Sequence, residues 1–446
     1  MFFAFKKRIF LKSSNVFSKT KSFRKLSIQT NNFNSNVDVA IFGGGIMGLF
    51  TGFWLKRQSP SLSVMVFEKD SKYKNSTTIL SCGGIRQQFS LKEHVQLSKF
   101  SAEFISAIND YLSVPNGEPV DVQFREDGYL FLATSEESAN TILENHKIQK
   151  ECNACVEILT PDKLKERFPW LNTDGLHFGS LGVKHEGCFD PHLYLTAVKR
   201  KVIHLGVKYT EAEVIDFVLK STGGSEKKET CNSVIIKTSN GETKEVNFSF
   251  GVIAAGYESG RLSRLLKIGT PTEDCRKVCC PVEPRKRFIF VFACPDKSIK
   301  APMVVDPTGV HFRSESKNFI SGKSPASWEE PDTNNLDVDY TYFDKAHWPI
   351  LAKRVQAFEA VKVIGAWSGF YDYNYFDENE IIGKHPYYSN LFWITGFSGH
   401  GIQMAAGAGK ALSELILYDS YQSIDLTKLG WQRILSNTPV YETNII

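Results

Sequence analysis

Residues 37–48 read VDVAIFGGGIMG, and this stretch decides the fold. The apolar run 37–42 predicts a buried strand, and residues 46–57 predict a helix directly after the glycine turn. Residues 62–68 predict a second strand, which ends in Glu68. A strand, a glycine-rich turn, a helix and a second strand ending in an acid predict a βαβ unit that binds a dinucleotide.

The three glycines of Gly43-x-Gly45-x-x-Gly48 have separate expected roles. Gly43 allows the tight turn, Gly45 lets the backbone approach a pyrophosphate, and Gly48 lets the helix pack closely against the sheet. The start of the helix offers unpaired N–H groups to the phosphates. Glu68 is expected to accept hydrogen bonds from a ribose and to repel a 2′-phosphate, which disfavours an NADP-type ligand. The alternative, a glycine-rich turn that binds nothing, does not account for the surrounding strands, helix and acid.

A second turn of this kind occurs at residues 396–401, which read GFSGHG. It follows a predicted strand, 391–395, and precedes a predicted helix, 404–417. A reduced flavin gathers negative charge, which backbone N–H groups and a helix N-terminus stabilise. NAD has no use for a second element of this type, so the turn favours FAD, although a plain helix entrance would look similar. Residues 250–256 predict a strand ending in AAG, a third backbone segment beside the dinucleotide.

Together these motifs resemble those of the FAD-dependent amine and amino-acid oxidoreductases, the D-amino-acid oxidase and sarcosine oxidase (DAO) family. The resemblance implies an α/β fold in which a Rossmann-like FAD-binding domain is interleaved with a strand-rich α+β substrate domain, as in the glutathione-reductase-2-like folds. The FAD-binding domain is expected to comprise residues 37–89, 190–270 and 360–446. The substrate domain is expected to comprise residues 90–189 and 271–359.

Three longer stretches narrow the resemblance to a mitochondrial branch of this family. They are GGIRQQFS at 83–90, PVEPRKR at 281–287 and WSGFYDYN at 367–374, and residues 444–446 add to them. The similarity extends from about residue 37 to residue 446. It implies a flavoprotein at the matrix side of the inner membrane that is required for assembly of respiratory complex I. The implied partners are complex I subunits or assembly intermediates.

Residues 1–36 have the composition of a mitochondrial transit peptide. They contain eight Lys and Arg residues and no acid, and the first acid is Asp38. Cleavage is expected between residues 26 and 36; the alternative is a disordered basic tail. Without these eight residues the chain has 45 basic and 49 acidic residues, so it lacks the excess of positive charge that is typical of a nucleic-acid-binding protein. No stretch reaches the ~18 apolar residues of a membrane span, and a peripheral membrane contact stays open.

The resemblance to sarcosine oxidase also extends to single positions around the flavin. Arg86 matches an arginine that lies close to the flavin in that enzyme, although an arginine here also suits a structural hydrogen bond. Phe89 stands where a second arginine grips the substrate carboxylate, and Gln403 stands where a lysine completes that grip. These two departures argue against N-methylglycine as the substrate.

Other candidates have a functional and a structural interpretation. His400 suits a general base, but the backbone of its turn alone also explains its position. Tyr371 and Tyr373 suit either a pocket wall or the core. Residues 285–287, RKR, suit either an anion site or a solvated basic stretch.

The expected site residues follow from these motifs and from the resemblance. The expected catalytic residues are Arg86 and His400. The expected cofactor-binding residues are Gly43, Gly45, Ile46, Met47, Gly48, Glu68, Lys69, Ser81, Ala255, Gly256, Gly396, Gly399, His400, Gly401, Ile402 and Gln403.

We expect the FAD to be held without a covalent bond, and we expect no metal. Relatives of this class attach flavin through a cysteine before the second glycine turn or a histidine near the first flavin loop. Residues 365–382 contain no cysteine, and residues 75–89 contain no histidine. The nine cysteines do not show the paired spacing of a zinc site.

Helix starts are expected at three further places. Ser90 and Glu93 have the spacing of a capping box at the start of a long amphipathic helix. Thr160-Pro161 and Asp190-Pro191 each place a cap residue before a proline at the first helical position. Residues 220–233 are polar and contain glycine, so they predict a surface hairpin or an insertion.

Overall fold

The fold contains two large sheets. Five parallel strands form most of the first one, and the βαβ unit predicted from residues 37–68 lies at its centre. The structure, a computed structural model, describes residues 36–221 and 229–444. Helix α2 (Ile46–Gln58) connects two neighbouring parallel strands. The parallel strands lie in the order β8 (Lys208–Ser221), β2 (Val64–Glu68), β1 (Asn36–Phe42), β10 (Thr243–Ile253) and β17 (Leu391–Thr395). Their carboxyl ends meet at one edge, where a ligand is expected to bind.

Two antiparallel strands complete this seven-stranded sheet. β16 (Ile381–Lys384) pairs with β17, and β9 (Glu229–Thr238) pairs with the outer parts of both β8 and β10. The pairing of β8 with β9 confirms the hairpin predicted around residues 220–233. Its tip, residues 222–228, lies outside the described residues.

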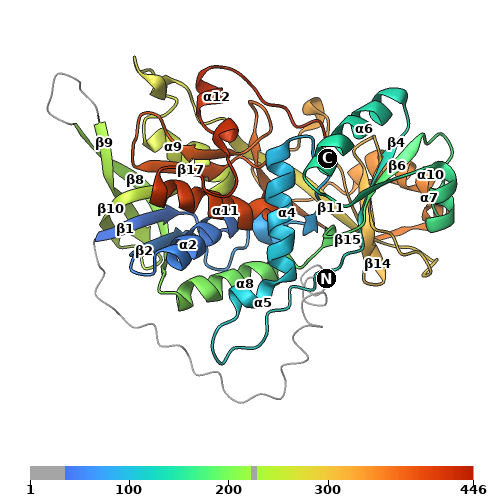
Figure 1. Cartoon of the computed structure of the whole chain (residues 1–446), viewed down its shortest axis with the longest axis horizontal. Helices are drawn as coiled ribbons and strands as arrows, with labels where there is room; N and C mark the ends of the chain where they lie inside the picture. Colours follow the sequence, from blue (N-terminus) through green and yellow to red (C-terminus); the bar gives the residue numbers. More distant parts are fainter. Residues whose placement is uncertain (1–35, 222–228, 445–446) are drawn as a thin grey trace. The chain divides into compact units, whose positions relative to one another are not determined.

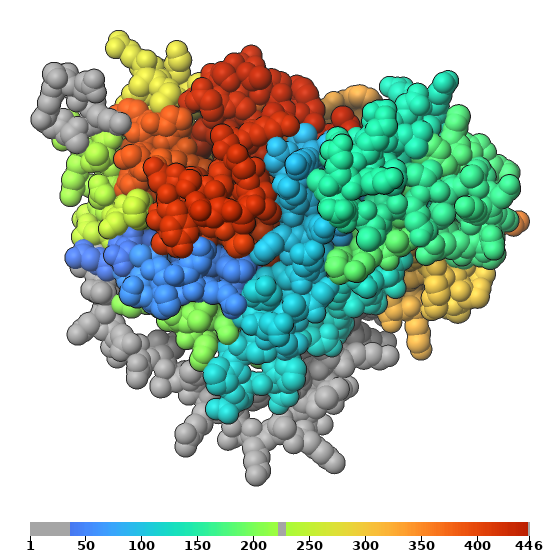
Figure 2. All heavy atoms as spheres, in the orientation of Figure 1, coloured from blue at the N-terminus to red at the C-terminus, as the bar shows by residue number. Residues whose placement is uncertain are grey.

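Helices α2 and α11 (Gly401–Tyr418) pack against one face of the first sheet. Helix α8 (Pro191–His204) packs on α2, and α4 (Lys92–Ser106) packs on α11. Helix α2 lies at the centre of this layer, and its residues 46–56 are all buried. Figure 2 shows α2, in blue, directly beside α11, in red, although the two helices come from opposite ends of the sequence.

The second sheet has eight strands and lies to the right of the first in Figure 1. All its pairs are antiparallel except that of β12 with β4. The order is β15 (Lys362–Asn374), β11 (Val282–Ala293), β14 (Asn318–Gly322), β13 (His311–Glu315), β12 (Met303–Val305), β4 (Tyr129–Ala133), β6 (Phe178–Gly182) and β5 (Val156–Leu159). Strands β11 to β14 follow one another along the chain, and all of them belong to this sheet.

Two elements lie in a different part of the fold from the one expected. β15 falls within residues 360–446, expected for the FAD-binding domain, but it pairs with β11 in the second sheet. Helix α4 falls within residues 90–189, expected for the substrate domain, but its apolar face packs against α11. The chain crosses between the two layers at both places, and the domain boundaries stay a prediction.

The capping box predicted at Ser90 and Glu93 is wrong. Helix α4 begins at Lys92, and its N-cap residue Leu91 provides no side-chain cap. The N–H groups of Ser90 and Leu91 instead donate to the carboxylate of Glu442. Thr160 and Asp190 do cap their helices as predicted.

In residues 36–221 and 229–444, no helix is long and apolar enough to cross a membrane. The expected transit peptide, residues 1–36, lies outside the described residues except for Asn36.

Candidate flavin site

A long cleft opens at the carboxyl ends of β1, β2, β10 and β17. Its walls come from the glycine turn after β1, from the end of β2, from residues 254–257 after β10, and from the turn before α11. The parallel pairing of these strands brings four distant segments of the sequence to one place.

The first glycine turn has the geometry that its three glycines predict. Gly43 has φ +119°, and a Cβ atom there would lie 2.2 Å from the Ala254 carbonyl oxygen. A Cβ atom on Gly48 would lie 2.0 Å from the carbonyl oxygen of Gly43, so the helix packs directly onto the turn. At Gly45 the nearest atom, Thr78 Oγ1, is 3.6 Å from such a Cβ, which leaves this backbone open toward the cleft.

Glu68 lies at the end of β2 with its carboxylate at the cleft. Its two oxygens accept hydrogen bonds from the N–H groups of Gly44, at 2.9 Å, and Asp70, at 3.0 Å. Burial raises the pKa of this carboxyl. The two backbone hydrogen bonds hold the carboxylate in place at the cleft, where a ribose hydroxyl can donate to it.

The second glycine turn is held by Asp372 on β15. The Asp372 carboxylate accepts hydrogen bonds from the N–H groups of Gly396, at 2.7 Å, and Phe397, at 3.2 Å. Burial raises the pKa of Asp372 to about 6. Gly399 follows with φ +96°, and no atom lies within 4 Å of a Cβ added there. Asp372 was not among the predicted residues; an acid inside an otherwise apolar strand was its one signal in the sequence.

The cleft fits a dinucleotide with a flavin. Helices α2 and α11 both begin at its wall, and in neither does the N-cap residue provide a side-chain cap. Uncapped helix starts leave N–H groups and a positive dipole end for anions. Gly256, with φ +55° and no atom within 4 Å of an added Cβ, gives a third open backbone segment.

Comparison with known proteins agrees with this geometry. The profile of the family DAO, FAD dependent oxidoreductase, matches residues 38–415. The chain belongs to this family. FAD is its cofactor.

Relatives and solved structures of the family cover nearly the whole chain. A Xenopus laevis protein named FAD-dependent oxidoreductase domain-containing protein 1 is 42% identical over 92% of this chain and 85% of its own. The structure of L-proline dehydrogenase from P. horikoshii has a TM-score of 0.77 at 23% identity, covering 91% of this chain and all of that one. Glycine oxidase from Geobacillus kaustophilus has a TM-score of 0.71 at 21% identity, covering 90% and 99%. The two solved structures show the likeness of fold.

A second pocket adjoins the FAD cleft of this DAO-family protein. It lies between the second glycine turn and the second sheet, where strands β11, β13 and β15 and the loop after β14 line it. Thr77, Ser81, Gly399 and Ile402 line both cavities, so the two lie side by side.

Arg86 and His400 lie together in the wall of the second pocket. The guanidinium Nη2 of Arg86 is 3.2 Å from His400 Nε2, and Arg86 is fully buried. Because arginine only donates, His400 Nε2 accepts and its ring proton lies on Nδ1. Burial and the charge of Arg86 lower the pKa of His400 to about 3, so the ring is neutral at pH 7. A nitrogen already engaged by Arg86 makes a poor general base, which favours the backbone role of this turn.

Phe89 and Gln403, at the positions compared with the carboxylate-binding residues of sarcosine oxidase, cannot bind a carboxylate in the same way here. Phe89 is fully buried, and its ring lies under the Arg86 guanidinium at 3.9 Å. The amide oxygen of Gln403 accepts from the Arg86 N–H at 2.9 Å, so it is committed to the scaffold. Both departures predicted from the sequence therefore have structural partners of their own.

The structure brings nearly all of the predicted site residues to the two cavities. The exceptions are Gly48, which lies in α2, and Gly396, the first residue of the second glycine turn. Those lining the FAD cleft are Gly43, Gly45, Ile46, Met47, Glu68, Lys69, Ser81, Ala255, Gly256, Gly399, Gly401 and Ile402. Arg86, His400 and Gln403 line the second pocket. Their individual roles stay predictions.

Several residues that line the two cavities belong to none of the motifs found in the sequence. Thr78 accepts from the N–H of Ile46 at the start of α2, at 3.3 Å. His311 and Lys323 line the second pocket from two neighbouring strands and their loops. Only the pairing of β13 with β14 brings these two side chains near residue 400.

The basic stretch 285–287 and the two tyrosines have defined partners. Arg285 pairs with Glu283 at 2.9 Å, and Arg287 pairs with Glu330 at 2.8 Å. Tyr371 accepts from Arg287 at 2.6 Å and lines the second pocket, which favours the pocket-wall interpretation for this tyrosine.

Acid precipitation of the FAD-loaded protein is expected to release all the flavin. Cys82 is the one cysteine that lines either cavity in the described part of the chain, and it lies in the second pocket. We expect a yellow supernatant and a colourless pellet. Flavin fluorescence that stays with the denatured band would contradict this prediction.

Replacing Arg86 by Ala is expected to shift the flavin absorbance or the reduction potential. The change removes a buried positive charge from the wall shared with His400. It also leaves buried acceptors without a donor, so we expect an unfolding free energy lower by about 1–3 kcal/mol. Spectroelectrochemistry of the FAD-loaded variant measures the first effect. An unchanged spectrum and potential would place Arg86 in the scaffold alone.

Proposed function

We propose that this flavoprotein works in mitochondria, at the matrix side of the inner membrane, and is required for assembly of respiratory complex I. What supports the proposal is the resemblance of the stretches at 83–90, 281–287 and 367–374, together with the composition of residues 1–36. Its partners are then complex I subunits or assembly intermediates.

The oxidoreductase part of the proposal rests on the adjacency of the two cavities. The second pocket shares Ser81, Gly399 and Ile402 with the FAD cleft, so it can hold a donor beside the cofactor. FAD, when bound, supplies the acceptor for a hydride from a carbon next to an amine. The chain supplies the pocket that binds and orients the donor.

The charge of the second pocket favours an active enzyme as the alternative function. Arg86, Arg287 and Lys323 line it, and none of the described residues that line it is Asp or Glu. Although Arg287 is paired with Glu330, the lining stays positive. Such a wall disfavours an ammonium ion and favours a carboxylate. It therefore holds the donor amine uncharged, as hydride transfer requires, with an acid group toward these cations.

This alternative is an amine or N-methyl amino acid oxidase or dehydrogenase of the sarcosine oxidase and dimethylglycine dehydrogenase type. The test is anaerobic mixing of the FAD-loaded protein with amino acids, N-methyl amino acids and the matching amines that lack the carboxylate. We expect bleaching of the flavin absorbance to be faster with the acids than with the matching amines. If none of these compounds bleaches the flavin, the enzyme alternative is contradicted, and the assembly role does not involve their oxidation.

The assembly role is tested in cells that lack the protein. Wild type, Gly45→Asp and Gly45→Asn are expressed, and assembled complex I is measured on native gels. Gly45→Asp places a carboxylate in the cleft and is expected not to hold FAD. Rescue by this variant would show that the flavin is dispensable. Normal complex I in the absence of the protein would contradict the assembly role.

The location is tested by import. We expect isolated mitochondria to take up the full chain and to remove a segment that ends between residues 26 and 36. N-terminal sequencing of the matrix protein checks the cleavage. An uncleaved N-terminus or a cytosolic protein would contradict the transit peptide.

A further inference from the structure

Residues 440–444, which we call the return segment, lead back to the flavin site from the end of the fold. They follow the short helix α12 (Gln432–Leu435) and are tied down at both ends. The carbonyl of Val440 accepts from the side-chain amide of Asn379, and its N–H donates to the carboxylate of Asp377 at 3.2 Å. The N–H of Thr443 donates to Ser90 Oγ at 2.8 Å. The return segment is therefore an ordered part of the fold.

Glu442 anchors the return segment to the start of α4. Its side chain is buried, and its carboxylate accepts from the N–H groups of Ser90, at 2.7 Å, and Leu91, at 3.0 Å. The N–H of Ser90 is one of the two donors that the predicted capping box was expected to satisfy. A carboxylate at a helix N-terminus also meets the positive end of the helix dipole.

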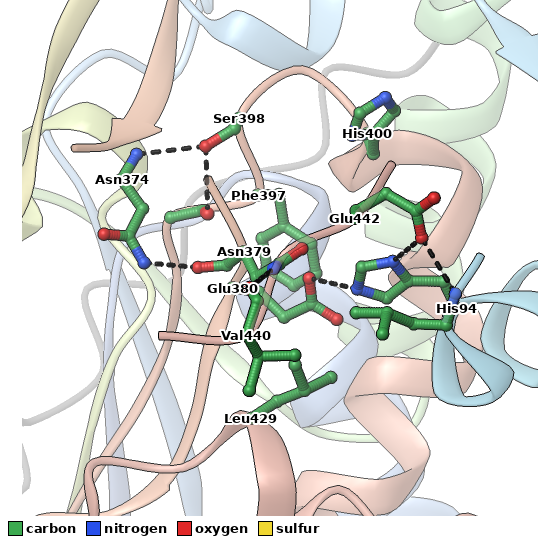
Figure 3. A network of polar contacts seen from close by, with 12 residues as sticks. His94, Asn374, Asn379, Glu380, Phe397, Ser398, His400, Leu429, Val440 and Glu442 are labelled. Atoms are coloured by element: carbon green, nitrogen blue, oxygen red, sulfur yellow. Dashed lines mark hydrogen bonds and ion pairs between the residues drawn. The ribbon is translucent and has the colours of Figure 1, made fainter. Parts of the chain in front are cut away.

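The same carboxylate belongs to a buried ionic triad. His94 lies between Glu442, 3.1 Å from its Nδ1, and Glu380, 3.2 Å from its Nε2, as Figure 3 shows. Burial lowers the pKa of His94, but the two carboxylates outweigh it and raise the pKa to about 10. His94 is thus protonated at pH 7 and donates to both acids. Removing either acid leaves a buried charge short of a partner, which is costly.

The return segment also contacts the wall of the second pocket. The carbonyl oxygen of Asn444 accepts from Arg86 Nη2 at 2.7 Å, and this nitrogen is the one that lies 3.2 Å from His400. The side-chain amide of Asn444 donates to the Gln88 carbonyl at 2.6 Å, and Arg86 Nη1 donates to the same carbonyl. The orientation of the Arg86 guanidinium therefore depends on the return segment.

We propose that the return segment is a working part of the flavin site, in which Glu442 and Asn444 are positioning residues for Arg86 and His400. Glu442 anchors the segment on α4, and Asn444 supplies the acceptor that aims the guanidinium. Arg86 in turn holds the His400 ring at the shared wall. The second pocket keeps its shape only while these contacts are made.

The test compares two changes in the return segment with a matched control elsewhere. The changes are Glu442→Gln and a chain that ends at Tyr441. The control is Glu414→Gln: this buried carboxylate accepts from the N–H groups of Gln422 and Ser423, both at 2.9 Å, and it does not line the second pocket. Unfolding temperature, bound FAD, flavin absorbance and reduction potential are measured for each FAD-loaded protein.

All three variants are expected to lower the unfolding temperature and to keep equimolar FAD. Only the two changes in the return segment are expected to shift the flavin absorbance maximum and the reduction potential. If the shorter chain does not fold, Glu442→Gln alone decides. A wild-type spectrum and potential in Glu442→Gln, with stability lowered as in the control, would overturn the proposal.

Discussion

Replacing Gly45 by Asp is expected to abolish FAD binding and to leave the fold intact. Gly45 has φ −69° and ψ −175°, which any residue adopts, and an added Cβ atom has room. It is the N-cap of α2, where Asp is as good as Gly or better by a few tenths of a kcal/mol. The new carboxylate, however, meets the phosphates at the helix start. Two like charges 4 Å apart repel by about 4 kcal/mol at an effective dielectric of about 20, which is roughly a thousandfold in affinity.

The matched control for this prediction is Gly45→Asn, which has the same shape and no charge. FAD affinity is measured by flavin fluorescence quenching, and stability by thermal unfolding of the FAD-free proteins. We expect Asn to weaken FAD binding much less than Asp, with both variants as stable as the wild type. Equal losses in the two variants would mean that crowding, and not charge, excludes the cofactor.

Replacing Glu68 by Ala is expected to weaken FAD binding ten- to hundredfold. The carboxylate is already oriented by Gly44 and Asp70, so a ribose hydroxyl meets a rigid, partly desolvated acceptor. A hydrogen bond to such a charged group contributes about 1.5–3 kcal/mol, and each 1.4 kcal/mol is tenfold in affinity.

Glu68→Gln is the control for this change, because it keeps one acceptor oxygen and loses the charge. We expect its FAD affinity to lie between those of the wild type and Glu68→Ala. Equilibrium dialysis of free FAD measures all three. An affinity of Glu68→Ala equal to that of the wild type would show that the ribose does not bind at the end of β2.

The sequence alone determined the elements whose structure depends on residues that follow one another in the chain. The strand, turn and helix of residues 37–58 follow one another directly, so the spacing of Gly43, Gly45 and Gly48 already specifies a helix start beside a strand end. The predicted limits of β1, α2 and β2 differ from the observed ones by at most two residues. The turn at 396–401 was equally readable, although α11 begins at Gly401, three residues before the predicted helix.

Only the tertiary structure decided how distant parts complete the site. The start of α4 is capped by Glu442, 352 residues from Ser90, so the local pattern of Ser90 and Glu93 pointed to the wrong acceptor. The second glycine turn depends on Asp372 from another sheet, and the second pocket unites strands β11 and β13 with Arg86. A hydrogen bond needs its partners close in space, not in sequence, and such partners leave no period or spacing to read. The sequence therefore predicts the cofactor, whereas the long-range packing of the chain shapes the pocket beside it.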